Sequence, residues 1–524
     1  MNFNLALPFY RQLALNGSRL AVSANGVEYT YAELGDLVNR TARWLRLRLG
    51  PNCRRVGLLA SRSLEAYAGA LAACWAGAAY VPLSPKLPRE RLLQVLELTQ
   101  LDAIIVDQVS VGLVQGLAPG CPQHLIAPSL ETSFSVADGA GGELHLAGRA
   151  ELPPYDETYQ PEAVAPADLA YVEFTSGTTG VPKGVMIAAE GVEVYLSLMQ
   201  ECYQLGEEDR LAETSDITFD ISVFNMFMTW RSGASLHVVP ASQVLAPSRF
   251  IREKAITFWF SVPSTASVMN RMRMLQPGAF PSLRCTIFAG EPLPAAAARA
   301  WQIAAPNSII DNHYGPTEAT VVCLGQRVSE PILVTPNRGI VAIGKPFRGT
   351  EVEILDSALN PVARGETGEI ALAGVQVAKG YFGDQKLTSS RFPTLRGKVW
   401  YLTGDLGYQD SDGIYHHLGR GDNQIKIMGN RVELEEIEGH LREVSGTDSV
   451  AAVAWPVEHG TASGIVAFLS GANTSISDIR QAMAKRVAPY MVPTRFVEIG
   501  ALPLNANGKT DRKELELRLR NGLI

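Results

Sequence analysis

Short apolar runs alternate with helical stretches from the N-terminus to about residue 420. The runs include "RVGLLA" (Arg55 to Ala60), "LRCTIFAG" (Leu283 to Gly290) and "NSIIDNHYG" (Asn307 to Gly315). Their content of β-branched and aromatic residues is typical of strands. Parallel neighbouring strands need a crossover connection, which is usually a helix. The alternation therefore predicts an α/β fold of mainly parallel sheets covered by helices.

The character of the sequence changes near Gly419. The stretch "GRGDNQIKIMGNRVELEEIEGHLREV" opens with a turn and continues as an alternating strand, Gln424 to Met428, and an amphipathic helix from about Glu433. A chain of 524 residues is also longer than a single hydrophobic core supports. We therefore predict a large N-terminal domain of residues 1–421 and a smaller α+β domain of residues 422–524.

Two segments need a separate interpretation. Residues 66–83, "AYAGALAACWAGAAYVPL", carry no charge and approach the length of a membrane span. Because glycines and Pro82 interrupt this run, we favour a buried helix that continues into a strand. Residues 128–166 are rich in Gly, Ala, Ser and Pro, and we expect a loop-like connection there.

Composition narrows the classes of partner. The chain has 46 Lys and Arg against 53 Asp and Glu, a net charge of −7, which argues against binding to nucleic acid or to anionic membranes. The six cysteines are scattered, and none belongs to a C-x-x-C pair or a zinc-like spacing. This pattern is typical of reduced thiols, and we expect a cytoplasmic protein.

The stretch "EFTSGTTGVPKGVMI", Glu173 to Ile187, places glycines, hydroxyls and a lysine directly after a predicted buried strand. Glycines let the backbone approach a ligand, while hydroxyls, freed N–H groups and a lysine can hold phosphate oxygens. The spacing differs from that of a Walker A loop. Taken alone, the stretch could equally be a polar turn between two strands. The candidate phosphate-binding residues are Thr175, Ser176, Gly177, Thr178, Gly180 and Lys183.

The order of motifs along nearly the whole chain resembles the adenylate-forming superfamily of acyl-CoA synthetases, luciferases and nonribosomal-peptide-synthetase adenylation domains. The residues of several motifs are most similar to those of amino-acid adenylation domains. The matching stretches are "YTYAEL" (Tyr29 to Leu34), "WAGAAYVPLSP" (Trp75 to Pro85), the loop Thr175 to Gly184, "FDISVFNMF" (Phe219 to Phe227), "NHYGPTEAT" (Asn312 to Thr320), "GEIALAGVQVAKGYFG" (Gly368 to Gly383), "YLTGDLG" (Tyr401 to Gly407), Gly419 to Glu438, "APYMVP" (Ala488 to Pro493) and "LPLNANGKTDRKEL" (Leu502 to Leu515).

The resemblance implies a reaction in two halves, with ATP and Mg²⁺ as cofactors. A carboxylate attacks the α-phosphorus of ATP to give acyl-AMP and pyrophosphate, and a thiol then attacks the acyl carbon. The loop residues named above would hold the departing phosphates. The remaining nucleotide roles implied are adenine contacts by Gly290, Asn312 and Tyr314, an α-phosphate contact by Thr317, Mg²⁺ binding by Glu318, ribose binding by Asp405, and a contact near ribose and phosphate by Arg420.

Lys509 in "NANGKTD" is implied to bridge the α-phosphate and the substrate carboxylate. By the same resemblance, the C-terminal domain is a mobile lid that carries Lys509 in for the first half-reaction. It would turn about Asp422 to present another face for the second half-reaction. Using one lid for two steps lets each half-reaction close around different reactants.

By the same resemblance, Asp220 pairs with a substrate ammonium, which argues for an amino acid because a buried carboxylate needs a cation. The implied side-chain pocket is largely apolar, and its make-up is similar to proline-type pockets except at Phe224. Small or branched aliphatic amino acids stay open as alternatives. The pocket residues are Asp220, Ile221, Phe224, Phe260, Ile287, Ala289, His313, Val321 and Val322.

The sequence ends at Ile524 without a phosphopantetheine attachment site, so we expect a freestanding ligase that loads a separate carrier protein. The alternatives are an acid–CoA ligase of the same fold and a non-catalytic relative. The presence of Lys183, Glu318, Asp405 and Lys509 together argues against the non-catalytic relative.

Overall fold

The structure is a computed structural model that describes the whole chain except residues 1, 138–141, 177–181, 423 and 505–509. The described residues form two compact units. The first unit comprises Met1–Pro85, Leu96–Phe174 and Gly184–Leu418, and the second comprises Lys86–Val95, Thr175–Lys183 and Gly419–Ile524.

The first unit contains two large sheets, in which parallel pairs dominate. One has the strand order β19 (Lys345–Pro346), β16 (Leu324–Arg327), β15 (Ile309–Tyr314), β14 (Cys285–Phe288), β13 (Phe258–Ser261), β11 (Arg210–Glu213), β12 (Ser235–Val238), β1 (Leu20–Ala24) and β2 (Val27–Thr30). The other has the order β10 (Lys183–Ala188), β9 (Leu169–Thr175), β4 (Ala79–Leu83), β3 (Arg55–Leu59), β5 (Ala103–Val106), β6 (His124–Ile126), β8 (Glu143–Ala147) and β7 (Phe134–Ala137).

The first unit also contains a third sheet, which is antiparallel, and two pairs of short strands. The sheet has the order β20 (Thr350–Leu355), β21 (Gly368–Gly374), β24 (Tyr401–Gln409) and β25 (Tyr415–Arg420). Two small hairpins pair β17 (Val334–Thr335) with β18 (Ile340–Val341), and β22 (Thr394–Leu395) with β23 (Lys398–Val399).

Helices connect these strands. The longest of them has a clear start signal in its sequence: the Thr30 side chain accepts a hydrogen bond from the backbone N–H of Glu33 in a capping box, which fixes the start of α2. The helices are α1 (Leu7–Asn16), α2 (Tyr31–Leu49), α3 (Leu64–Trp75), α4 (Arg89–Thr99), α5 (Val111–Leu117), α6 (Ala189–Tyr203), α7 (Ile221–Arg231), α8 (Ser248–Glu253), α9 (Pro263–Arg271), α10 (Ala295–Ala304) and α11 (Gln385–Arg391).

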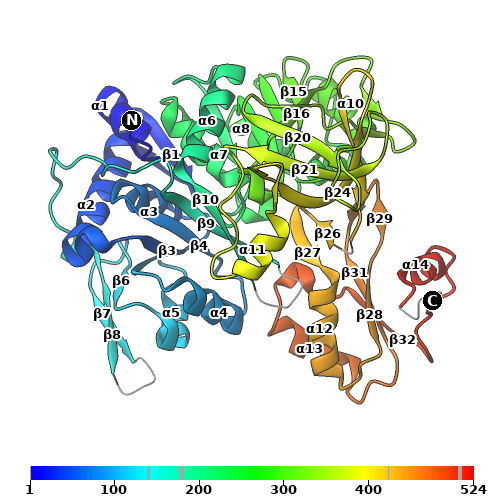
Figure 1. The fold of residues 1–524 in the computed structure, drawn as a ribbon. Coiled ribbons are helices and arrows are strands. Elements are labelled where there is room, and N and C mark those ends of the chain that lie inside the picture. The colour runs from blue at the N-terminus through cyan, green and yellow to red at the C-terminus, as the bar shows by residue number, and fades with distance from the viewer. Residues whose placement is uncertain (1, 138–141, 177–181, 423, 505–509) are drawn as a thin grey trace. The chain divides into compact units, whose positions relative to one another are not determined.

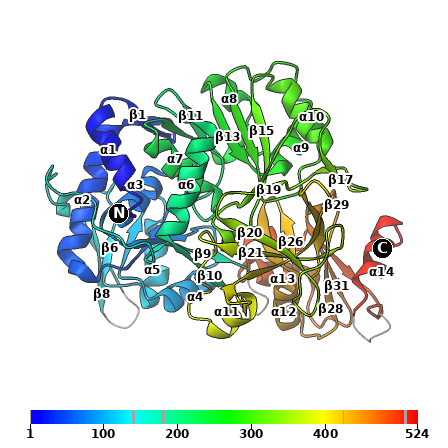
Figure 2. The same ribbon diagram turned by 45° about the horizontal axis from the view of Figure 1, so that its top comes forward.

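Helices cover both faces of the sheet that contains β13, β14 and β15 (Figure 2). Trp259 and Phe288 on one face belong to a core cluster with Trp301 of α10. Phe258 and Phe260 on the other face contact a side chain of α7, Phe224. Because side chains alternate along a strand, successive residues of β15 serve opposite faces. Residues 311 and 313 lie with the α7 face, and residues 312 and 314 lie with the α10 face.

The second unit is a small α+β domain with its own cores (Figure 1). Helices α12 (Leu434–Ser445) and α13 (Ile476–Ala484) share a cluster with one face of the sheet β28 (Val450–Ala454), β31 (Ile465–Leu469) and β32 (Arg495–Glu498). Helix α14 (Arg512–Arg520) packs on the other face. A second sheet has the order β27 (Asn430–Glu433), β26 (Gln424–Ile427), β30 (Thr461–Ala462) and β29 (Val457–Glu458).

The predicted α/β class is confirmed, and so is the buried helix that leads into a strand: α3 and β4 occupy the alanine-rich run. In the described part of the chain, no helix combines the length and the apolar composition that crossing a bilayer requires. The loop-like connection predicted for residues 128–166 is wrong in part. Strands β7 and β8 pair there as an antiparallel hairpin, with Phe134 opposite Leu146 and Ala137 opposite Glu143.

Candidate active site

The carboxyl ends of β13, β14 and β15 bring the predicted pocket residues together in the first unit. In parallel sheets, ligands commonly bind beyond the carboxyl ends of the strands. Phe260 lies opposite Ile287 in the strand register, and Ile287 lies opposite Asp311. Ala289 directly follows β14, and His313 lies two residues after Asp311 on the same face of β15. The structure thus places these predicted residues side by side.

Helix α7 covers this face of the sheet. Asp220 is the residue before the helix, with Ile221 at its first position. The ring of Phe224 lies 5.2 Å from Phe258 and 5.3 Å from Phe260, measured between ring centroids. Phe224 is fully buried. The side chains between α7 and these strands are therefore mainly apolar, and Asp220 lies directly before the helix.

Val321 and Val322, the last predicted pocket residues, lie on a strained turn. Thr320 and Val321 have φ values of 53° and 66°, in the left-handed region that β-branched residues rarely adopt. Such conformations cost about 1–3 kcal/mol each and persist where the surroundings enforce them. At this turn the enforcing residue is Gln376.

Gln376 was not identified from the sequence, and its buried side chain holds the strained turn. Its Nε2 donates to the carbonyl oxygen of Val322 at 2.9 Å, with longer contacts to the oxygens of Thr320 at 3.4 Å and Ala319 at 3.5 Å. The hydroxyl of Thr320 donates to the backbone oxygen of Gln376 at 2.6 Å. The sequence signal was one polar residue inside an otherwise apolar stretch, between Val375 and Val377.

Glu173 is a second functional candidate that sequence reasoning missed. It lies on β9 just before the predicted phosphate loop and is 4% exposed. Burial, together with the carboxylates of Asp220 and Asp216, raises its pKa well above the usual value. An acidic residue inside the buried strand "LAYVEF" was the available signal. The predicted pocket therefore has a second acid close to Asp220.

Asn312 presents an unused acceptor on the α10 face of β15. Its Nδ2 donates to the carbonyl oxygen of Ala342 at 2.9 Å. Its Oδ1 is buried and has no hydrogen-bond partner. A buried amide oxygen without a partner is costly, so this atom suits a ligand N–H group. Gly290, the second residue after β14, has a φ of +88°, a conformation that favours glycine.

Tyr314 and Asp405 form the next part of the site. The hydroxyl of Tyr314 donates to Oδ2 of Asp405 at 2.6 Å, and His417 Nε2 lies 3.4 Å from Oδ1. Burial and the neighbouring carboxylate raise the pKa of Tyr314 well above its usual value, so its phenol keeps the donated proton. Each carboxylate oxygen has two lone pairs, so Asp405 can still accept ligand hydroxyls.

Thr317 and Glu318 lie on one short 3-10 turn, Thr317–Ala319. Glu318 is fully buried, and its Oε1 accepts a hydrogen bond from the Tyr381 hydroxyl at 2.8 Å. The backbone oxygen of Glu318 accepts from the N–H of Ala378 at 2.8 Å. Within the described residues, no group of three or more His, Cys, Asp or Glu side chains is arranged for a metal. A metal here would depend on Glu318 and on ligand oxygens.

The described part of the predicted phosphate loop belongs to the second unit. The hydroxyl of Ser176 donates to the backbone oxygen of Arg431 at 2.7 Å. Nζ of Lys183 lies 3.2 Å from Oε1 of Glu433, an oxygen that also accepts from Nε2 of Gln424 at 2.5 Å. The first two contacts join the loop ends to β27, and the third joins β27 to β26.

The remaining predicted residues divide between the second unit and the undescribed positions. Oγ1 of Thr175 is buried without a hydrogen-bond partner. Arg420 pairs with Asp422, the predicted hinge residue, through two contacts of 2.7 and 2.8 Å. The predicted residues that lie outside the described part of the chain are Gly177, Thr178, Gly180 and Lys509.

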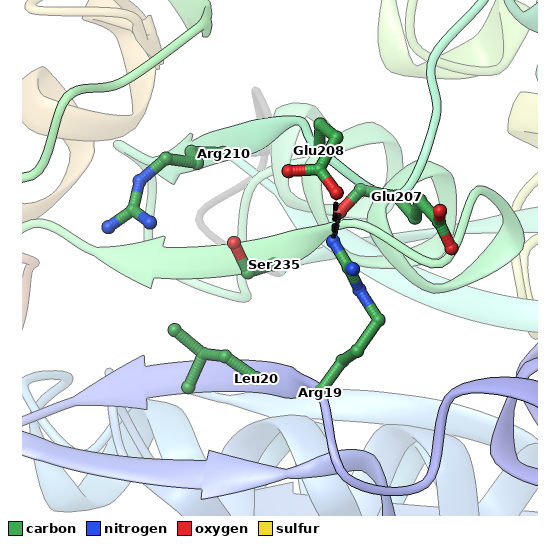
Figure 3. Close-up of a pocket in the computed structure, with 6 residues that line it drawn as sticks. All are labelled: Arg19, Leu20, Glu207, Glu208, Arg210 and Ser235. Atoms are coloured by element: carbon green, nitrogen blue, oxygen red, sulfur yellow. Dashed lines mark hydrogen bonds and ion pairs between the residues drawn. The ribbon is translucent and has the colours of Figure 1, made fainter.

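A separate hollow of about 170 Å³ lies at the surface of the first unit (Figure 3). Inside it, Arg19 pairs with Glu208 across 2.9 Å. Its lining residues are Arg19, Leu20, Glu207, Glu208, Arg210 and Ser235. None of these lining residues belongs to the predicted site. The hollow is therefore separate from the carboxyl ends of β13, β14 and β15.

Comparison with known proteins supports the motif-based resemblance. Residues 9–382 match the family model described as AMP-binding enzyme. The Vibrio cholerae adenylation domain AlmE, solved in complex with glycyl-adenosine-5'-phosphate, is 31% identical with a TM-score of 0.88, and the match covers 99% of this chain and 98% of that one. IdnL7 is 32% identical with a TM-score of 0.72, and all of both chains is covered (100% each).

The similarity extends to a much longer protein. Tyrocidine synthase 3 of Brevibacillus parabrevis is 33% identical over 516 residues, which make up 97% of this chain. The chain spans only 8% of the length of that relative. The match is therefore to one segment of a much longer synthase.

Proposed function

The chain belongs to the AMP-binding enzyme family and is an adenylate-forming ligase, and we propose that it activates an amino acid as its aminoacyl adenylate. One observation carries this proposal: neighbouring residues of β15 lie on opposite faces of the sheet. Asn312 offers an unused amide oxygen on one face, and His313 lies on the other face with the apolar residues of the predicted pocket. A nucleotide and an acid side chain could therefore be held at the end of one strand.

The nucleotide half of the proposed site begins with Asn312. Its Oδ1 would accept a hydrogen bond from the adenine amino group, while Nδ2 keeps its bond to Ala342. Tyr314 would stack on the ring, and Gly290 would let the backbone lie close to it. Asp405 would accept the ribose hydroxyls, because an ionised carboxylate only accepts hydrogen bonds.

Glu318 fits a magnesium ion, which prefers carboxylate and phosphate oxygens. The Tyr381 hydroxyl would orient this carboxylate from one side. When bound, the ion would supply positive charge to the phosphate oxygens. Thr317 would contact the α-phosphate from the same turn.

The reaction itself needs little covalent work from the protein. The substrate carboxylate attacks the α-phosphorus and pyrophosphate leaves, so catalysis consists of positioning and charge stabilisation. Thr175, Ser176 and Lys183 would hold the leaving phosphates, together with Gly177, Thr178 and Gly180 of the same loop. Lys509 would bridge the α-phosphate and the attacking carboxylate, and Arg420 would lie near the ribose.

Asp220 would pair with the substrate ammonium. The side chain would then enter the pocket of Ile221, Phe224, Phe260, Ile287, Ala289, His313, Val321 and Val322. Its apolar lining favours a proline-like or small aliphatic amino acid. The relative solved with glycyl-adenosine-5'-phosphate supports an amino acid as the class of substrate.

The second half-reaction that we propose transfers the aminoacyl group to the phosphopantetheine thiol of a separate carrier protein. The similarity of the chain to one segment of a much longer synthase, tyrocidine synthase 3, supports a carrier-protein acceptor. Residues 422–524 would act as the mobile lid, with Asp422 at the hinge. The lid would bring Lys509 to the first half-reaction and withdraw it for the second.

The decisive experiment is amino-acid-dependent ATP–pyrophosphate exchange with the common amino acids, D-alanine and pipecolate. We expect exchange with at least one of them and a loss of it in Asp220→Ala. Lys509→Ala should lose adenylate formation but keep much of the transfer from preformed aminoacyl-AMP. Thioester formation on coenzyme A in place of a carrier protein would identify the acid–CoA ligase instead. No exchange with any amino acid would refute the proposed function.

A further inference from the structure

His313, the one imidazole of the predicted pocket, belongs to a chain of hydrogen bonds that begins outside the pocket. Arg327 donates to Asp311 through Nε at 2.6 Å and Nη2 at 3.2 Å. The Tyr203 hydroxyl lies 2.7 Å from Oδ2 of Asp311 and 3.1 Å from Nε2 of His313. The chain therefore runs from Arg327 through Asp311 and Tyr203 to His313.

The Arg327–Asp311 pair determines which atom donates in each hydrogen bond of this chain. Asp311 pairs with a guanidinium, so its carboxylate is an acceptor. Tyr203 has a single hydroxyl proton, which it donates to Asp311, and burial raises the pKa of Tyr203 well above its usual value so that this proton stays. The Tyr203 oxygen must therefore accept from His313, which requires the proton on Nε2.

The imidazole is neutral, which leaves a lone pair on Nδ1. Burial lowers the pKa of His313 to about 4, so the ring carries a single proton at neutral pH. With that proton on Nε2, Nδ1 is an acceptor. Nδ1 is buried and has no hydrogen-bond partner. A buried acceptor without a donor is unfavourable, and a ligand donor would remove that cost.

The packing of the His313 ring determines the direction in which the Nδ1 lone pair points. A Cβ on Gly325 of β16 would lie 3.0 Å from Cδ2 of His313, so the Cδ2 edge faces β16. Nδ1 is on the opposite edge of the imidazole and faces the other neighbour of β15, which is β14. Phe288 of β14 pairs with Asn312, and the next residue, Ala289, offers only a methyl group. The lone pair therefore faces the predicted pocket.

We propose that Nδ1 of His313 accepts a hydrogen bond from the substrate side chain, so that the enzyme prefers small amino acids with an uncharged O–H or N–H donor. This inference rests on the proposed function and narrows its substrate class. Among proline-like and small amino acids, the inference favours a substrate with a side-chain hydroxyl over the analogue that lacks it. Tyr203 and Asp311 are positioning residues, because they act only through the tautomer of His313.

The first test compares matched substrates in pyrophosphate exchange with the wild-type enzyme. The pairs are serine with alanine, threonine with valine, and 4-hydroxyproline with proline. We expect the hydroxylated member of the best pair to have a kcat/KM higher by about tenfold or more, because a site built for a hydrogen bond rejects the analogue that lacks it. Equal or higher values for every apolar member would overturn the inference while leaving the proposed function intact.

The second test uses two substitutions of similar size. His313→Asn keeps an amide oxygen near the position of Nδ1 and should retain the preference for the hydroxylated substrate. His313→Leu has no acceptor and should lose it. Loss of the preference in both variants, or in neither, would contradict the proposed role of Nδ1.

A measurement without turnover covers the case in which the variants do not fold. ¹⁵N NMR of wild-type protein labelled in histidine should show one ring with Nε2 protonated and Nδ1 unprotonated at neutral pH. The favoured hydroxylated amino acid should shift the Nδ1 signal of that ring, and Tyr203→Phe should perturb its tautomer. A protonated Nδ1 in the free enzyme would overturn the inference.

Discussion

Tyr381 donates its hydroxyl proton to Oε1 of the fully buried Glu318 across 2.8 Å. This contact joins the segment after β21 to the turn that carries the proposed magnesium ligand. Because a carboxylate rotates freely when nothing holds it, the Tyr381 hydroxyl fixes which oxygen faces the ligand side.

Tyr381→Phe should therefore weaken productive binding of Mg·ATP. A hydrogen bond to a charged group contributes about 1.5–3 kcal/mol, which corresponds to a rise of about tenfold or more in the KM for Mg·ATP. The measurement is pyrophosphate exchange over a range of ATP and Mg²⁺ concentrations. Tyr415→Phe is the matched control, because its hydroxyl donates to a backbone oxygen, that of Val352, at 3.0 Å. An equal rise in KM for both variants would count against the role of Tyr381.

Gln376→Leu should release the strained turn at Thr320 and Val321. The variant keeps side-chain size but removes the donor to Val322, and the turn can relax toward negative φ. We expect the KM for the amino acid to rise about tenfold, with a smaller change in kcat. Gln302→Leu on α10 is the control, since Gln302 also donates to backbone oxygens, at 3.3 and 3.5 Å. A pure loss of stability, with KM unchanged, would show that Gln376 does not position the pocket.

Asn312 should make the enzyme selective for a purine with a 6-amino group. Its unpartnered Oδ1 needs a donor, and inosine triphosphate offers a carbonyl oxygen at that position. Two facing acceptors are repulsive, so we expect kcat/KM to be lower by about 100-fold for ITP than for ATP. Asn312→Ala should reduce this ratio. The experiment compares both nucleotides at saturating amino acid, and equal use of ITP by the wild-type enzyme would contradict the assigned role.

Local sequence patterns predicted the strands that bear the site. The runs around β3, β9, β14 and β15 are short, apolar and bounded by turn residues, so their strands could be located without knowledge of the rest of the chain. The hairpin of β7 and β8 was missed. Its strands are only partly buried, and composition rich in small residues is typical of loops as well as of short strands.

The residues that shape the site from a distance could not be predicted. Gln376 reaches Val322 across a separation of 54 residues, and Tyr381 reaches Glu318 across 63. Such contacts depend on how β21 and the turn after β15 meet in space, and no local period encodes that. The acidic Glu173 was visible as an exception inside its strand, but its proximity to Asp220 depends on the tertiary fold.

Glu213 should make the stability of the protein depend on pH. It is fully buried at the end of β11, and burial raises its pKa to about 7, against hydrogen bonds from Asn225 and the backbone of Ser215 that favour the ionised form. The folded state therefore holds a proton that the unfolded state releases at about pH 4.5. The stabilisation from the neutral carboxyl is complete below that pH and is lost as the pH rises to about 7.

The expected loss is about 3 kcal/mol of unfolding free energy for this one group, since one pKa unit corresponds to about 1.4 kcal/mol. Glu213→Gln keeps the acceptor for Asn225 and Ser215 but cannot ionise. Its denaturant midpoint should exceed that of the wild type at pH 8, and the difference should shrink toward pH 5. Glu97→Gln, at an exposed position, is the control and should follow the wild type throughout. A constant difference between Glu213→Gln and wild type across this range would mean that Glu213 does not titrate there.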